Sequence, residues 1–185
     1  MVAFADPSPT NSDLLGVPII PENEIEHSIP MIVAIGSNFA RRSVMERFVT
    51  LRSIESFATL IHPSASIGRH VCIGAGSVIL QNATIGVGAR IGAGVIVNSG
   101  AILDHESEMG DFSSLAPGST TGGQVSIGVE TAISIGATVS HGVTIGQQCV
   151  VGGQSFVNDD LPDRSVAYGI PARNVRQRAE NERYL

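Results

Sequence analysis

The sequence of 185 residues predicts a mainly β protein whose central part, residues 62–158, is a parallel β-solenoid. A small partial α/β domain in residues 1–61 precedes it, and a C-terminal cap and tail in residues 159–185 follow it. Three observations support this: an aliphatic residue recurs every six positions from residue 67 onward, glycine follows many of these residues, and the side chain two positions before each is small. A period of six matches neither the 3.6 of a helix nor the 2 of an alternating strand. It is typical of short flat strands joined by tight corners and stacked coil upon coil.

The first 61 residues lack the six-residue period and combine short extended pieces with one helix. The extended pieces are expected at residues 2–5, 16–20, 31–36 and 57–63, the last of which leads into the solenoid. A helix is expected over about residues 39–52, with Ser37 or Asn38 as its N-cap. This is an α/β pattern, but about 60 residues are too few for a complete doubly wound domain.

The repeat itself spans sixteen consecutive positions at intervals of six. These positions are Ile67, Ile73, Ile79, Ile85, Ile91, Val97, Leu103, Met109, Leu115, Thr121, Ile127, Ile133, Val139, Ile145, Val151 and Val157. Thr121 is the only departure from the apolar series. We expect these side chains to point inward and to stack on their equivalents in neighbouring coils, and we expect the corner glycines to accept backbone angles that a Cβ would resist. The unbroken apolar phase argues against a flexible glycine-rich segment.

The composition excludes several classes of function. All 11 basic residues are Arg and the chain has no Lys, which rules out a Lys Schiff base and a P-loop Lys. The net charge of −6 and the lack of a long basic run argue against nucleic-acid binding. No stretch reaches 18 unbroken apolar residues and the N-terminus lacks a signal-peptide pattern, so we expect a cytoplasmic protein without a membrane partner. Cys72 and Cys149 fit no metal or redox spacing and are expected to be free thiols at packing positions.

Residues 64–158 resemble the hexapeptide-repeat family. The resemblance implies a left-handed parallel β-helix with three hexapeptides per coil, which gives about five coils for this run. It also implies a homotrimer with active sites in the grooves between the prisms. The run GIPAR, residues 169–173, resembles the C-terminal cap of hexapeptide acetyltransferases. Arg173 and Arg176 would then meet the phosphates of CoA, or else belong to a solvated tail of mixed charge.

The segments AFADPSP, LLGVPII, MIVAIGSNFARR and ATLIHPSASIG carry a closer resemblance. They resemble the sugar acyltransferases that have an N-terminal, Rossmann-like nucleotide-sugar domain, among them the bacillosamine and perosamine N-acetyltransferases and the sialic acid O-acetyltransferases. In that family a first strand and a glycine-rich turn precede these segments, so the chain is expected to be N-terminally shortened. Of the family's sugar-nucleotide contacts, the resemblance carries over Asp6, Gly36 and Asn38.

His105 is the main candidate for a catalytic side chain. It lies in the densest polar stretch of the solenoid, between Asp104 and Glu106, and such acidic neighbours would orient the ring and stabilise its protonated form. From spacing alone, a catalytic base and a surface histidine are equally good interpretations. Gly123 lies 18 residues farther, one coil above His105. A side chain there would crowd anything that approaches His105, whereas a bare backbone N–H would meet a developing oxyanion.

The family resemblance assigns roles to this stretch. It implies that His105 is the general base, that Glu106 tunes it and that Asn98 positions the acceptor. It places contacts to acetyl-CoA at four positions, which are Ser114, Gly123, Ile135 and Gly153. Ser114 stands where the family usually has a second histidine, which is a departure from the family's pattern.

His141 lies 36 residues after His105, two coils along, which raises the question of a metal site. Hexapeptide-fold carbonic anhydrases use three histidines shared between subunits, but residues 142–150 lack the third, so we expect no metal. The sequence predicts an acetyl-CoA-dependent acetyltransferase that acts on an amine or a hydroxyl of a sugar or nucleotide-linked sugar. The alternative is a non-catalytic trimeric solenoid that binds sugar nucleotide or only assembles. A metal-dependent lyase would require a bound metal.

Overall fold

A computed structural model describes residues 3–8, 10–26, 29–50, 53–179 and 182. Contacts between residues divide the chain into two compact units, Met1–Pro30 and Met31–Leu185. The first unit holds a small sheet in the order β1-β3-β2, in which β3 pairs in parallel with β1 and antiparallel with β2. Its elements are β1 Phe4–Asp6, β2 Asp13–Leu14, β3 Val17–Pro21 and a 3-10 turn, Glu22–Glu24. The extended piece expected at residues 16–20 is β3, whereas residue 2, where the first piece was expected to begin, lies outside the described residues.

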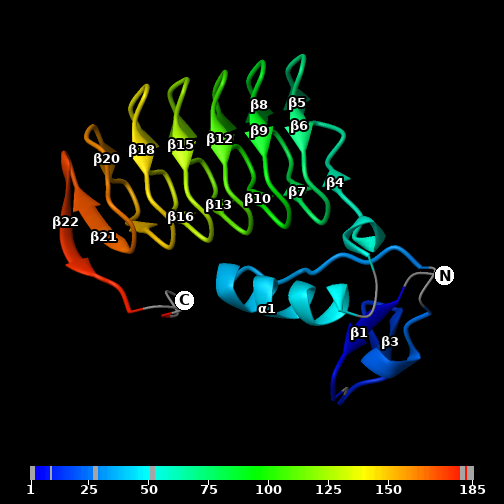
Figure 1. Ribbon diagram of the computed structural model, residues 1–185. Helices are drawn as coiled ribbons and strands as arrows, with labels where there is room; N and C mark the ends of the chain where they lie inside the picture. The colour runs from blue at the N-terminus through cyan, green and yellow to red at the C-terminus, as the bar shows by residue number, and fades with distance from the viewer. Residues whose placement is uncertain (1–2, 9, 27–28, 51–52, 180–181, 183–185) are drawn as a thin grey trace. The chain divides into compact units, whose positions relative to one another are not determined.

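The second unit is the predicted left-handed parallel β-helix, a row of coils with three sheets as its walls (Figure 1). Sheet 1 contains β4 Leu60–Ile61, β7 Val78–Ile79, β10 Ile96–Val97, β13 Ser114–Leu115, β16 Ala132–Ile133, β19 Val150–Val151, β21 Ser165–Gly169 and β22 Ala172–Gln177. Sheet 2 contains β5 Ser66–Ile67, β8 Thr84–Ile85, β11 Ile102–Leu103, β14 Thr120–Thr121, β17 Thr138–Val139 and β20 Phe156–Val157. Sheet 3 contains β6 Cys72–Ile73, β9 Arg90–Ile91, β12 Glu108–Met109, β15 Ser126–Ile127 and β18 Thr144–Ile145. The sixteen strands β5 to β20 are the sixteen predicted hexapeptides.

Residues 18 apart in the sequence lie side by side in adjacent coils. On sheet 1, Ile96 pairs in parallel with Ser114, and Ser114 pairs in the same way with Ala132. The chain passes from sheet 1 to sheet 2 to sheet 3 within each coil, so the prism has three corners. We name them by the sheets that they join: the 1–2 corner, the 2–3 corner and the 3–1 corner.

The inward series forms the core of the prism. From Ile79 to Val157, every member of the series is at most 4% exposed, including Thr121 at 2%. Ile67, in the first coil, is 38% exposed because no earlier coil covers it. Burial of each such aliphatic side chain contributes about 1.5–3 kcal/mol, so the column of stacked side chains is the main source of stability.

The glycines that follow the inward residues have a different role from the one expected. The corner backbone with positive φ belongs to other residues, such as Gly76 (φ 72°) and Glu106 (φ 53°), and not to Gly68 or Gly110. A Cβ at Gly68 would lie 2.7 Å from the backbone nitrogen of Val87 in the next coil. Glycine is therefore required there because the coils approach closely, not because of its backbone freedom.

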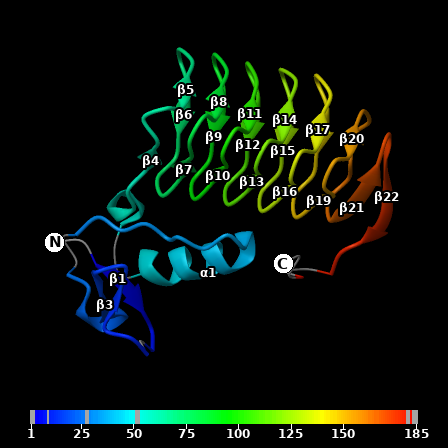
Figure 2. The ribbon, with the colours of Figure 1, turned by 180° about the vertical axis from the view of Figure 1, so that it is seen from behind.

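One helix, α1 Asn38–Val49, packs along the 3–1 corner. Ser37 is its N-cap and accepts a hydrogen bond from the backbone nitrogen of Ala40 at 3.4 Å. Figures 1 and 2 show the helix running beside the row of coils. Its buried residues are Asn38, Arg41, Met45 and Phe48. The helix thus buries a face that includes a charged side chain.

Arg41 is fully buried and holds this helix on the solenoid. Its Nε donates to the carbonyl of Gly94 at 2.6 Å and its Nη2 to the carbonyl of Phe112 at 2.9 Å, two corner residues of adjacent coils. Its Nη1 donates to the carbonyls of Ile35 and Gly36 at 2.9 and 3.1 Å. One guanidinium therefore ties the segment before the helix to two coils.

These contacts place the boundary between the units after residue 30, whereas we expected it after residue 61. Residues 32–36 do not form the expected strand, because the carbonyls of Ile35 and Gly36 accept from Arg41. Met31 alone forms a parallel bridge, with Phe57. A 3-10 turn, Ile54–Ser56, follows the helix, and the expected strand at residues 57–63 is reduced to β4.

The C-terminal segment closes the last coil. Strand β21 pairs in parallel with β19 and antiparallel with β22, so it continues sheet 1 and ends it in a hairpin. Arg178 Nη1 donates to the carbonyl of Gln148 at 2.6 Å and fastens the end of the hairpin to the 3–1 corner. Within the described residues, no helix is long and apolar enough to cross a membrane.

We predict that Arg41→Met lowers the free energy of unfolding by about 3 kcal/mol, because it leaves several buried carbonyls without a donor. Urea denaturation followed by circular dichroism measures this. Arg47→Met is the matched control. Arg47 is exposed on the same helix, with its guanidinium 5.2 Å from the centroid of the Phe48 ring, and its substitution should change the free energy by about 1 kcal/mol or less. Equal effects of the two substitutions would show that the buried cation does not anchor the helix.

Candidate active site

His105 lies in the 2–3 corner, two residues after β11. Asp104 Oδ1 accepts a hydrogen bond from the backbone nitrogen of His105 at 2.7 Å and lies 3.1 Å from its Nδ1. The pKa of the Asp104 carboxyl lies below its usual value. The largest cause is the hydrogen bond from the backbone nitrogen of His105, and the next is the hydrogen bond to the His105 side chain. Asp104 therefore stays ionised and can only accept, so Nδ1 carries the proton and Nε2 keeps its lone pair.

Both side chains are about half exposed, at 48% for His105 and 47% for Asp104. Solvent screens such a pair, so its contribution to stability is small. The stabilisation from the pair is fully present at pH values above the usual pKa of Asp. It is lost as the pH falls through the lowered pKa of Asp104. The pair therefore orients the imidazole over the whole neutral range.

Gly123 occupies the equivalent corner position in the next coil, as the 18-residue spacing predicts. Its residue is buried, and a Cβ there would overlap the imidazole ring of His105. Gly123 is not among the residues with positive φ, so the lack of a side chain is a matter of space. The neighbouring Gly122 is the corner glycine, since a Cβ on it would lie 2.7 Å from the backbone nitrogen of His141. Gly123 thus makes room for the catalytic candidate.

The backbone of Gly123 also leaves a donor available. Its carbonyl accepts from the nitrogen of Gly142 at 3.0 Å, and the next residue, Gln124, donates to the carbonyl of His105 at 2.8 Å. Among the hydrogen bonds of the described residues, none uses the N–H of Gly123 as a donor. An unused N–H beside an imidazole is what an oxyanion-binding group requires.

His141 completes the column on this corner. Its ring centroid lies 6.1 Å from that of His105, with the two planes tilted by 36°. Both side chains belong to exposed residues, and the bare Gly123 lies between them in the stack of coils. Within the described part of the chain, no group of three His, Cys, Asp or Glu side chains is arranged to hold a metal ion.

Glu106 does not touch the imidazole in this structure. Its Oε2 accepts from Gln124 Nε2 at 2.8 Å, one coil above. The backbone of Glu106 has a positive φ of 53°. The carboxylate at His105 is that of Asp104, on the other side of the histidine in the sequence.

Apart from Gly123, the residues expected to contact acetyl-CoA or to position the acceptor lie elsewhere on the protomer. Asn98, Ile135 and Gly153 are in the 1–2 corner, and Ser114 is on β13 of sheet 1. Gly153 stacks next to Ile135, since a Cβ on it would lie 3.3 Å from Ile135 Cγ2. Ile135 is 58% exposed. Apart from Ser114, the residues expected to act in catalysis, to contact acetyl-CoA or to position the acceptor thus form two groups on two corners, with sheet 2 between them.

The three residues expected to bind the nucleotide sugar also differ in their surroundings. Asp6 ends β1 in the first unit, where its Oδ1 accepts from the backbone nitrogen of Ser8 at 2.7 Å. Gly36 is exposed just before the helix. Asn38 is 1% exposed, and its Nδ2 donates to the carbonyls of Glu130 and Thr131, both at 3.2 Å. The Asn38 side chain is therefore committed to holding the helix on the solenoid.

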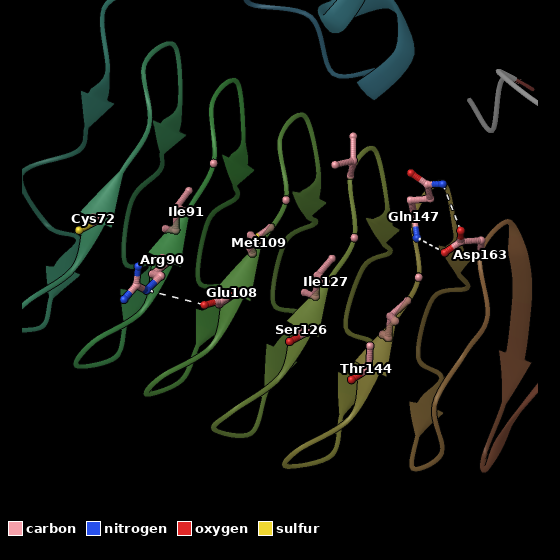
Figure 3. Close-up of a pocket in the computed structure, with 16 residues that line it drawn as sticks. Cys72, Arg90, Ile91, Glu108, Met109, Ser126, Ile127, Thr144, Gln147 and Asp163 are labelled. Carbon is pink, nitrogen blue, oxygen red and sulfur yellow. Dashed lines mark hydrogen bonds and ion pairs between the residues drawn. The ribbon is translucent and has the colours of Figure 1, made fainter.

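A shallow groove of about 670 Å³ runs along sheet 3 (Figure 3). Arg90 Nε lies 3.7 Å from Glu108 Oε1 on its surface, and Gln147 is hydrogen-bonded to Asp163 at its far end. The exposed Cys72 lines it, whereas Cys149 is buried, so only the second cysteine is at the expected packing position. The groove lining contains no histidine and no residue of the His105 turn.

No protein-family model matches this sequence, and no curated protein does. Solved structures do match. PerB from Caulobacter crescentus, determined in complex with CoA and GDP-perosamine, is 32% identical over 89% of this chain and 81% of its own, with a TM-score of 0.79. The acetyltransferase domain of PglB from Neisseria gonorrhoeae is 31% identical over 94% of this chain and 86% of its own, with a TM-score of 0.87. WeeI from Acinetobacter baumannii, at 20% identity and a TM-score of 0.76, shares the fold. Identity at this level over most of both chains shows that the protein belongs to the hexapeptide-repeat sugar acyltransferase family that its sequence resembles.

Proposed function

We propose that the protein is an acetyl-CoA-dependent acetyltransferase that moves an acetyl group to an amine or a hydroxyl of a nucleotide-linked sugar, with His105 as general base. The observation that carries the proposal is the arrangement at the 2–3 corner. A charged Asp104 fixes the proton on Nδ1 of His105, and the ring lies over the bare Gly123. PerB, with CoA and GDP-perosamine, and the PglB domain, also determined with acetyl coenzyme A, support the substrate classes.

Acetyl-CoA, when bound, supplies a thioester whose carbonyl carbon is open to attack by an amine or a hydroxyl. Nε2 of His105 takes the proton of the attacking group as its bond to that carbon forms, and then gives it to the sulfur as the carbon–sulfur bond breaks. Asp104 stabilises the imidazolium between these two transfers. The N–H of Gly123 donates to the carbonyl oxygen while negative charge builds on it. Atoms and charge balance, with CoA thiol and the acetylated sugar as products.

The 1–2 corner offers a surface on which the pantetheine arm of CoA would lie. Ile135 presents an exposed apolar side chain, and Gly153 beside it has no side chain that would cover this surface. The two arginines expected to meet the CoA phosphates are already paired: Arg173 Nη1 lies 3.4 Å from Asp159 Oδ2, and Arg176 is hydrogen-bonded to Glu182 at 2.7 Å. The Arg176 bond lowers the pKa of Glu182 to about 2, so CoA phosphates would have to displace a charged carboxylate.

A homotrimer would join the two groups of residues, and we include it in the proposal. The helix α1 packs on the 3–1 corner, and the remaining two corners both flank sheet 2. If three copies turn sheet 2 toward a common axis, the 2–3 corner of each copy meets the 1–2 corner of the next. His105 of one protomer would then face Ile135 and Gly153 of its neighbour. Phe156 on sheet 2 is 37% exposed on a single chain and would be covered in such an assembly.

We predict that His105→Ala lowers kcat by about a hundredfold or more, because the attacking group loses its base. Its thermal stability should change little, since the ring is half exposed. Release of CoA thiol, measured with a panel of nucleotide-linked amino sugars and with sialic acid, gives the rate. His62→Ala, in the first coil, is the matched control and should keep the wild-type rate. Unchanged turnover in His105→Ala would remove this residue from the mechanism.

Titration calorimetry with acetyl-CoA separates this function from a scaffold. An enzyme of this kind should give heat of binding, with about one site per protomer when the trimer is intact. A protein that releases no CoA and shows no heat would be the non-catalytic solenoid considered above.

The two acids beside His105 should differ in their effect. We expect Asp104→Asn to lower kcat by about tenfold or more, because it removes the charge that holds the imidazolium. Glu106→Gln keeps an acceptor for Gln124 and should cost less. The same CoA-release assay compares them, and a larger loss in Glu106→Gln would mean that this carboxylate reaches the ring during turnover.

Gly123→Ala should separate activity from stability. The added methyl would displace the imidazole of His105 and so lower kcat by about tenfold or more. The ring is the movable end of a half-exposed side chain, so the unfolding temperature should stay close to that of the wild type. Gly100→Ala is a contrasting variant: nothing lies within 4 Å of a Cβ there, but its φ of 66° makes the substitution strained. It should lower stability and leave kcat unchanged, and a parallel loss of both properties in Gly123→Ala would contradict our interpretation.

A further inference from the structure

Thr121 is the one member of the inward series with a polar side chain. It ends β14 on sheet 2 and is 2% exposed. A hydroxyl buried among aliphatic side chains is costly unless it is hydrogen-bonded. Its Oγ1 accepts a hydrogen bond from the backbone nitrogen of Asp104 at 3.0 Å. The hydroxyl is therefore satisfied by the residue that holds the catalytic imidazole.

This bond replaces a regular bond of the solenoid. In the coil before, the nitrogen of Gly86 donates to the carbonyl of Leu103 at 2.7 Å, and in the coil after, Gly122 donates to the carbonyl of Val139 at 2.8 Å. Asp104 occupies the same position in its own coil but donates to a side-chain oxygen.

The register of the strands shows the same local change. Strands β11 and β8 pair at both of their residues, Ile102 with Thr84 and Leu103 with Ile85. Strands β11 and β14 pair only at Ile102 and Thr120. The ladder between the coils is thus interrupted at Leu103, immediately before Asp104 and His105.

The interruption has a direct consequence for the imidazole. The backbone nitrogen of Asp104 is fixed by Thr121, and its carboxylate Oδ1 faces both the backbone nitrogen and the Nδ1 of His105. A valine at position 121 would have the same shape but no acceptor, so the nitrogen of Asp104 would have to return to the regular carbonyl bond. That return would shift the Asp104 carboxylate relative to the ring.

We propose that Thr121 is a positioning residue, whose hydroxyl sets the Asp104 turn so that the carboxylate holds Nδ1 of His105. The inference rests on the proposed function of His105. It assigns a role to the single position at which the apolar repeat is broken.

The test compares Thr121→Val with Thr121→Ser and with a matched control. Thr131→Val is that control, because Thr131 is also fully buried and its Oγ1 accepts from the nitrogen of Cys149 at 2.9 Å, at the 3–1 corner. We expect Thr121→Val to lower kcat by about tenfold with the KM for acetyl-CoA unchanged. Thr121→Ser retains the hydroxyl and should keep at least half of the activity. Thr131→Val should lose stability and keep the wild-type kcat.

A readout without turnover accompanies these rates. The ¹⁵N chemical shifts of His105 in the full chain report which ring nitrogen carries the proton. The wild type should show the Nδ1–H form, and Thr121→Val should show a mixture of the two tautomers. An unchanged tautomer in Thr121→Val, or an equal loss of kcat in Thr121→Val and Thr131→Val, would overturn the proposal. If the wild type transfers no acetyl group, the proposed function fails, and the ¹⁵N shifts still decide whether Thr121 sets the imidazole.

Discussion

Hydrogen bonds between backbones of adjacent coils determine where every side chain of this solenoid lies. Parallel strands pair at about 4.8 Å, and nine of the sixteen positions after an inward residue are glycines at which a Cβ would collide with the next turn of the chain. The pairing also fixes a column of residues at intervals of 18 along each corner. His105, Gly123 and His141 share one such column, which is why residues far apart in the sequence form one site. The candidate chemistry thus depends on the regularity of the core rather than on a flexible loop.

The helix α1, unlike the coils, is held in place by a buried charge, that of Arg41. A buried guanidinium is favourable only when its donors are satisfied, and Arg41 meets this condition with carbonyls from two coils and from the chain before the helix. Among the described residues, no backbone N–H donates to the carbonyls of Gly94 and Phe112, so these two are available to the guanidinium. The helix thereby covers the 3–1 corner and leaves the other two corners open for substrates or for other protomers.

Much of the architecture was predictable from the sequence, and the limits have physical causes. The six-residue period gave the strands, the inward residues and the 18-residue columns, because a repeat carries its own register. The place of Arg41 could not be read from the sequence, since a buried charge depends on carbonyls supplied by residues more than fifty positions away. Asp104 and Glu106 flank His105 equally in sequence, but only Asp104 is hydrogen-bonded to the ring, whereas Glu106 is bonded to Gln124 in the next coil. The acceptor sugar, by contrast, would in the proposed trimer be recognised between copies of the chain, which no local pattern encodes.

The interval of 18 residues also restricts how this protein can change in length. A deletion of one residue between His105 and Gly123 would carry every later position to a different point on the circumference, so the side chain of Gln124 would arrive where the ring now lies. Gain or loss of a whole coil leaves the columns aligned. Within the coils, the changes of length that keep the columns aligned are therefore those of complete turns, whereas the chain before residue 60 and after residue 158 lies outside the columns.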